Sequence, residues 1–296
     1  MGLKLLEELM QTATPIINAT DVSHLLKLYA EGNRDFANAD LSGADLSGIS
    51  LIGVNLTGAN LRGANLSRAI LTKSDLSNAN LLWANLSFAK MSHSKLIEAD
   101  LTKANLSGAL MEKAKLPGAK LSGANLSNTN LRRANLWGAN LSGANLQRSN
   151  LREANLIGVN LNWANLYEAR LSNASLLGAS LNGVNFSRAF LKDVDLNGVD
   201  LQGINLSEAR LGGANLEGAN LIAANLSEAH LRLVNLKGAD LTRANLIGAS
   251  LERANLTWTN FSKADLTNAD LSEATLRGAI LEDADLSGAI LPSETE

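Results

Sequence analysis

Large apolar residues occupy every fifth position of the chain from Phe36 to Leu291. The series has 52 members, of which 47 are Leu, three are Phe and two are Met, and nothing interrupts it. A small residue, most often Ala, stands two positions before each member, with Asn or Asp usually between them. The repeating unit is therefore Ala-(Asn/Asp)-Leu followed by two mostly small or polar residues, as in Ala64-Asn65-Leu66-Ser67-Arg68.

A period of five fits neither regular secondary structure. On an α-helix, five residues advance about 140° beyond a full turn, so the Leu side chains would scatter around the cylinder. On a flat strand, an odd period would place successive Leu side chains on opposite faces. Ala and Leu two positions apart can share one side of a short extended segment, and the chain must then turn. We therefore expect each pentad to form one side of a closed coil.

A longer period of 20 residues shows how many sides the coil has. Gly recurs at 118, 138, 158, 178, 198, 218 and 238, and one column from Asp45 to Asp285 holds Asn or Asp at every twentieth position. Twenty residues correspond to four pentads, so 52 pentads predict thirteen coils. At about 4.8 Å per stacked strand the rod would be roughly 60 Å long. The predicted fold class is an all-β solenoid.

The motif Ala-(Asn/Asp)-Leu-X-X resembles the pentapeptide-repeat family, and the resemblance covers residues 34–291. It implies a right-handed quadrilateral β-helix, and the handedness comes from the resemblance alone. The segment Leu25-Leu26-Lys27-Leu28-Tyr29-Ala30-Glu31-Gly32 is similar to the segments that precede the repeats in cyanobacterial members.

The two ends of the repeat differ in sequence. Residues 1–33 predict a short helical cap, in which Thr20 or Asp21 can cap a helix that ends at Gly32. Residues 34–291 form the repeat region and 292–296 a C-terminal tail. Ile280 and Ile290 replace the usual Asn or Asp near the end of the repeat. We expect either end-to-end association of two copies through this last coil or a frayed end.

Composition narrows the function. The 296 residues contain no Cys, only three His and a formal net charge of −3. Disulfides and thiolate metal sites are thereby excluded, and no cofactor or metal site is expected. No apolar run reaches the roughly 18 residues that a membrane helix needs, and the N-terminus lacks a signal-peptide pattern. We expect a cytoplasmic protein that does not enter the membrane and, for lack of a catalytic constellation, is not an enzyme.

The side of the coil that carries Leu51, Leu71, Met91 and Met111 is predicted to be basic. Eleven Lys or Arg residues face six carboxylates there, a balance of 11 − 6 = +5. Within it, the residues expected to contact a partner are Arg132, Arg133, Arg152 and Arg170. This side is either a solvated surface of mixed charge or a binding surface for an acidic partner, and nucleic acid is unlikely because acids dilute the stripe and aromatic residues are not interleaved.

An adjoining side is predicted to carry a stripe of apolar residues on consecutive coils: Ile97, Pro117, Trp137, Ile157 and Leu177. Gly residues follow four of them and leave them uncovered. A contiguous exposed apolar surface is typical of a protein interface, and Trp is a frequent anchor there. The alternative is ladder-like packing of side chains that stabilises the rod.

Two functions from different classes remain. The first is a non-enzymatic interaction protein or scaffold that presents a rod-shaped surface to an unidentified protein partner. The alternative is a DNA-mimic inhibitor or protector of DNA gyrase or topoisomerase, which the family resemblance implies for some members. That mimicry requires a strongly negative rod, whereas the repeat region here is close to neutral with one positive side.

Overall fold

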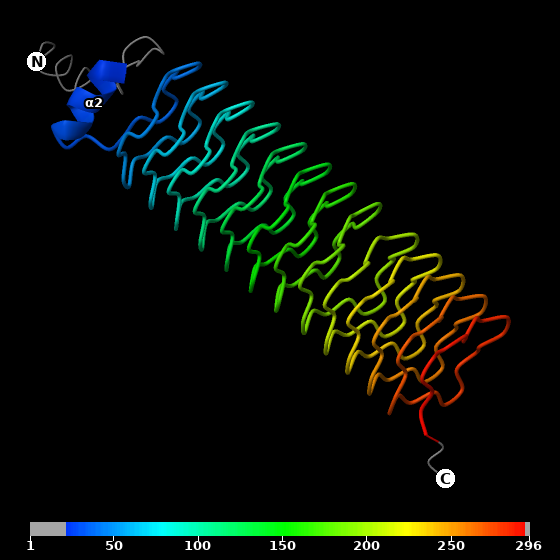
Figure 1. The fold of residues 1–296 in the computed structure, drawn as a ribbon. Helices are drawn as coiled ribbons and strands as arrows, with labels where there is room; N and C mark the ends of the chain where they lie inside the picture. Colours follow the sequence, from blue (N-terminus) through cyan, green and yellow to red (C-terminus); the bar gives the residue numbers. More distant parts are fainter. Residues whose placement is uncertain (1–21, 294–296) are drawn as a thin grey trace, which may run out of the picture.

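The computed structural model describes residues 22–293, which wind into a long stack of coils with a helix at one end (Figure 1). Parallel bridges join the residues of the Asn/Asp position to those twenty positions later, from Asp35↔Asn55 to Asp270↔Ile290, except between Ser180 and Asp200. Four pentads therefore make one coil. Each side pairs with the next coil through a single residue, and the described residues contain no continuous strand; their only regular element is helix α2, Val22–Ala30.

Each corner of a coil is a tight β-turn. At one such corner the backbone N–H of Ala44 donates to the carbonyl of Leu41 at 3.1 Å, and Gly43 between them has φ of +67°. A hydrogen bond of this span with positive φ at the third residue is the arrangement of a type II turn. Gly adopts that φ without steric cost, which explains why Gly recurs at this position.

Two residues of each pentad fill the interior of the rod: the small residue, usually Ala, and the large apolar residue, usually Leu. Leu41 and Ala44 are buried, and so are their counterparts through Leu271 and Ala274, except for the partly buried Ile49, Ala179 and Val199. Leu276, Leu281 and Leu286 are only partly buried and Leu291 is exposed, because no further described coil stacks on them. The count of thirteen coils stays a prediction from the repeat arithmetic.

The Asn position has a structural role in both directions of the stack. The side-chain amide of Asn85 donates to Oδ1 of Asn65, one coil away, at 3.2 Å. Its own Oδ1 accepts the backbone N–H of Ser87 at 3.1 Å. One side chain thus bonds its counterpart in the neighbouring coil and the turn that follows it, so Asn stabilises both the stack and the corner.

Helix α2 covers the first coil. Leu25 of the helix is fully buried, and the Tyr29 hydroxyl donates to the carbonyl of Ile52 at 3.1 Å. The helix ends at Ala30, and Gly32, the residue expected at its end, follows in the closing turn with φ of +101° and a bond from the N–H of Asn33 to the carbonyl of Leu28 at 3.0 Å. This is the Schellman pattern. The predicted capping residues Thr20 and Asp21, and the rest of the cap before them, lie outside the described residues.

Between the coils of residues 171–190 and 191–210 the hydrogen bonding loosens, and we call this place the seam. Two of the four sides keep their bonds, for example Leu171 N–H to the Phe190 carbonyl at 2.8 Å. On the other two sides, and at the residues next to them, the backbone hydrogen bonds found between all other described coils are missing. The backbone N–H groups without their expected bond are those of Asn173, Leu176, Gly178, Leu181, Gly183, Asp195, Asp200 and Asn205.

Local sequence accounts for the seam. Ser175 and Ser180 replace Asn on the two opened sides, so the column of Asn side chains is broken there. In the next coil, Val194 and Val199 replace the usual inward Ala. They immediately precede the residues twenty positions after Ser175 and Ser180. A branched side chain occupies more space than Ala in a close-packed interior, and neighbouring backbones must then move apart. The regular stack is correspondingly interrupted in the yellow-green part of Figure 1.

Candidate protein-interaction surface

Two of the four predicted partner-binding arginines are engaged by a single carboxylate. Arg132 lies 3.0 Å from Glu153 and Arg133 lies 2.6 Å from it. The hydrogen bond from Arg133, followed by that from Arg132, lowers the pKa of Glu153 below its ordinary value. Arg132 also approaches Glu112 at 3.8 Å. The charge of this pair is therefore largely balanced within the rod itself.

The other two predicted arginines differ. Neither Arg152 nor Arg170 forms an ion pair with any residue in the described part of the chain, and the same holds for Arg210. Arg170 and Arg210 instead stand on either side of Phe190, with guanidinium carbons 5.8 Å and 4.7 Å from the ring centroid. The sequence grouped all four arginines together, whereas the structure divides them into a balanced pair and two unbalanced ones.

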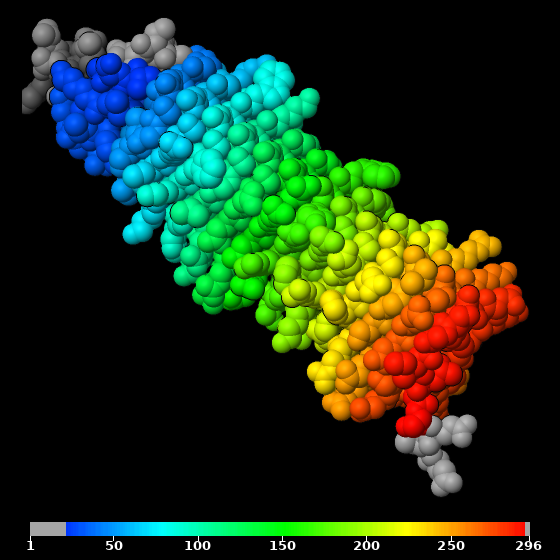
Figure 2. All heavy atoms as spheres, viewed as in Figure 1, coloured from blue at the N-terminus to red at the C-terminus, as the bar shows by residue number. Residues whose placement is uncertain are grey.

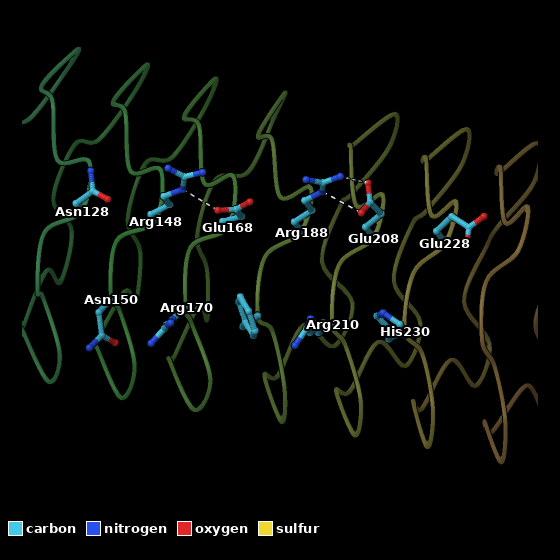
Figure 3. Close-up of a pocket in the computed structure, with 11 residues that line it drawn as sticks. Asn128, Arg148, Asn150, Glu168, Arg170, Arg188, Glu208, Arg210, Glu228 and His230 are labelled. Carbon is cyan, nitrogen blue, oxygen red and sulfur yellow. Dashed lines mark hydrogen bonds and ion pairs between the residues drawn. The ribbon is translucent and has the colours of Figure 1, made fainter.

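Two shallow grooves run beside Phe190. The first groove has a volume of about 920 Å³, and Figure 3 shows its two rows of side chains along successive coils. In one row Arg148 bonds Glu168 at 2.7 Å and Arg188 bonds Glu208 at 2.9 Å. The hydrogen bond from Arg148, helped by one with Tyr167, lowers the pKa of Glu168. Two of the three carboxylates in this row are therefore balanced by arginines, and the third, Glu228, has no ion pair among the described residues.

The second groove, of about 540 Å³, shares Phe190, Arg210 and His230 with the first. Those three residues form the ridge between the grooves. The remaining lining residues are Arg152, Ser172, Lys192, Gly212 and Arg232. No carboxylate lines this groove, and Gly212 leaves the space where its neighbours carry long side chains. The charged side chains that line the second groove are therefore all of one sign.

The predicted apolar stripe lies on one side of the rod, because its residues each follow a bridge residue in successive coils. Trp137 is 56% exposed and Leu177 is 72% exposed, while Ile97 and Ile157 are partly buried. The stripe ends at the seam, where Leu177 lines a cleft of about 580 Å³. Asn197 takes its place in the next coil and also lines the cleft.

Sequence reasoning missed the role of Phe190 and of its neighbours. Phe190 stands in the column that has largely lost Asn, and the residues twenty positions before and after it are Arg170 and Arg210. An aromatic residue between two arginines at an interval of 20 was the available signal. The charge balance of the whole side does not contain this signal, because it sums over the coils and loses the order of the residues along them.

Other kinds of site find no support among residues 22–293. No group of three or more His, Asp or Glu residues there is placed to hold a metal ion. No helix of that part is long and apolar enough to cross a membrane. On the face shown in Figure 2, the side chains form a continuous rod-shaped surface.

Comparison with known proteins supports the reading of the repeat. The family model described as Pentapeptide repeats matches in overlapping segments from 35–72 to 254–291. Among solved structures, HetL from the cyanobacterium Nostoc sp. strain PCC 7120 is 34% identical, with a TM-score of 0.27. The alignment covers 93% of this chain and 98% of HetL, which is described as a pentapeptide repeat protein involved in heterocyst differentiation regulation.

A second structure, alr5209 from Nostoc PCC 7120, is 38% identical over 36% of this chain and 84% of its own, with a TM-score of 0.34. Rfr23 from the cyanobacterium Cyanothece 51142 is 26% identical over 53% of this chain and 90% of its own, with a TM-score of 0.20. No curated protein matches the chain. From the repeat and the sequence identity, the chain belongs to the pentapeptide-repeat family, for which the right-handed quadrilateral β-helix is the expected fold.

Proposed function

We propose that this protein is a non-enzymatic scaffold whose rod-shaped surface binds a protein partner. The supporting observation is the apolar stripe. Trp137 and Leu177 are largely exposed although they are large and apolar, and both lie on the same side of the rod. Gly138 and Gly178, which follow them, have no side chain to cover them. Exposed apolar residues aligned along one side, anchored by Trp, are characteristic of a binding surface.

The seam adds a second reason to place the contact there. Leu177 ends the stripe at the 580 Å³ cleft, where the expected backbone bonds of Leu176 and Gly178 are missing. A partner that covers Trp137 and Leu177 would therefore bury apolar surface and reach backbone N–H groups that the rod does not use. Both kinds of contact favour a protein partner over a small ligand.

The test is retention of proteins from a native lysate by the full chain and by a Trp137→Ser, Leu177→Ser variant. The matched control is Trp258→Ser, because Trp258 is 60% exposed but lies outside the stripe. We expect a partner retained by the parent and by the control variant and lost by the stripe variant. Equal retention by all three proteins would show that the stripe is structural.

The alternative, inhibition or protection of DNA gyrase by DNA mimicry, has less support. A mimic of duplex DNA must present a strongly negative rod, whereas this chain has a net charge of only −3 and a groove lined by cations. A supercoiling assay with purified gyrase distinguishes the two functions, since the scaffold leaves supercoiling unchanged.

End-to-end pairing of two copies is a further part of the proposal. Ile280, Ile290 and Leu291 are exposed at the C-terminal end of the described rod. Two such ends, brought together, would cover each other's apolar side chains. The length of each rod in the pair is set by the expected thirteen coils. Light scattering over a range of concentrations tests this pairing, and a constant monomer mass would contradict it.

A further inference from the structure

Five cations rise along one side of the rod, one from each of five consecutive coils; four of them line the second groove, and Arg170 lines the first groove beside it. Bridges join Asn150, Arg170, Phe190, Arg210 and His230 in order, which fixes the sequence of coils. The cations of these coils are Arg152, Arg170, Lys192, Arg210 and Arg232. Two stand in the bridge column itself and three stand two residues after it, so the positive charges alternate between the two edges of a narrow strip.

The spacing of these charges defines the shape of what they can bind. Neighbouring coils stack about 4.8 Å apart, so the first and last cations are about 19 Å apart along the rod axis. An extended peptide rises about 3.3 Å per residue, and about six residues would span that distance. Side chains of an extended peptide point alternately to opposite sides, as the cations of the strip do.

Most of this charge is uncompensated. Arg152, Arg170 and Arg210 form no ion pair within the described residues. Lys192 meets Asp193 only at 3.7 Å, and Arg232 is paired with Glu252 at 3.2 Å. An exposed cation without a carboxylate gains more from an incoming anion than one that is already paired.

The groove favours an acidic peptide over a nucleic acid. A single-stranded nucleic acid would stack its bases on an aromatic ring, but Arg170 and Arg210 already occupy positions close to the Phe190 ring. A peptide side chain needs only the outer guanidinium N–H groups, which remain accessible in this arrangement.

We propose that the second groove binds an extended, acidic segment of a partner protein, about six residues long, laid along the rod axis. The inference rests on the proposed function, in that it names the chemistry of part of the partner. It places this contact on a different side of the rod from the apolar stripe, so a partner could engage both.

The experiment measures fluorescence anisotropy of a labelled hexaglutamate peptide with the full chain at low salt. The groove variant is Arg152→Gln with Arg210→Gln. The matched control is Lys73→Gln with Lys113→Gln, which removes the same charge from the same basic side outside the groove and from residues that likewise have no ion pair. We expect the groove variant to weaken binding at least tenfold and the control to change it less than twofold.

Three results would overturn the proposal. Absence of peptide binding up to millimolar protein would do so, and so would an equal loss in both variants, because net charge alone would then explain binding. Tighter binding of an eight-nucleotide single-stranded DNA than of the peptide would assign the groove to nucleic acid. The Trp137→Ser, Leu177→Ser variant is measured with the same peptide. If it binds the peptide as the parent does and also retains the same proteins from the lysate, the apolar stripe is not a binding surface, while the proposal for the groove is supported.

Discussion

Replacing both Ser175 and Asp195 with Asn should close part of the seam. On this side of the rod the Asn column runs on both flanks, with Asn155 donating to Asn135 at 3.1 Å and Asn215 donating to Asp195 at 2.9 Å. Ser175→Asn alone adds bonds only to Asn155 and Leu177, on the near side of the seam, because the carboxylate of Asp195 has no proton to donate across it. With Asp195→Asn as well, the new amide at 195 can donate across the seam to the new Oδ1 at 175.

The size of the effect follows from the bond gained. One added hydrogen bond across the seam predicts that local opening there becomes about 0.5–1.5 kcal/mol more costly. In a solenoid each coil is stabilised by its neighbours, so a weakened interface lowers the stability of both adjoining segments. In the parent, the amides of Leu176 and Gly178 should exchange with solvent at least about 100-fold faster than that of Leu156, which donates at 2.8 Å one coil away.

Hydrogen exchange read by mass spectrometry or NMR checks this directly. The Ser175→Asn, Asp195→Asn variant should slow exchange at the seam by up to about tenfold, since about 1.4 kcal/mol corresponds to a factor of ten. The matched control is Ser250→Asn, because Ser250 stands in an intact part of the stack whose backbone bonds are made. It should leave the seam amides unchanged. If Leu176 and Gly178 in the parent are protected as strongly as Leu156, the seam does not exist in solution and the reasoning fails.

Two further predictions concern corners and charge. Gly183→Ala should lower the melting temperature more than Gly143→Ala. Both have positive φ, but a methyl group at 183 would clash with the Trp163 ring, whereas at 143 it meets nothing within 4 Å. Equal melting temperatures would show that the ring moves aside freely. Glu153, whose pKa is lowered by Arg133, should stabilise the fold above the ordinary glutamate pKa of 4.5 and lose that contribution as the pH falls. Glu153→Gln should therefore reduce the melting temperature at pH 7 and not at pH 3, and the same reduction at both values would contradict the assignment.

The fold could be predicted from the sequence because the signal is repeated many times. A single pentad such as 64–68 would be ambiguous, but fifty of them with a period of 20 permit only one closed arrangement of four sides. The end of the helix could also be predicted, since Gly32 supplies the positive φ that a Schellman motif requires. Both predictions depend on local backbone geometry, which individual residues specify strongly.

The seam and the groove could not be predicted in the same way. Ser in place of Asn, as at Ser175, and Val in place of the inward Ala, as at Val194, each occur elsewhere in the repeat without loss of backbone hydrogen bonds. Only their combination on adjacent coils interrupts the hydrogen bonding between the coils. Likewise, whether the charge of Arg133 is balanced depends on where the flexible side chain of Glu153 reaches. In the sequence Glu153 is the neighbour of Arg152, yet it pairs with Arg133 one coil away and leaves Arg152 unpaired among the described residues. Interactions between long side chains on neighbouring coils are decided by rotamers, which the repeat pattern leaves free.

The pairing of each residue with the one twenty positions later restricts how such a chain can change length. An insertion of twenty residues adds one whole coil, keeps every column in line and moves the groove beside Phe190 about 4.8 Å farther along the rod. An insertion of five residues keeps the interior equally well filled but turns all later surface residues to the next side. The core would tolerate both changes, whereas a partner that reads two sides at once would accept only the first. The distance between surface sites on this rod can therefore vary only in steps of one coil.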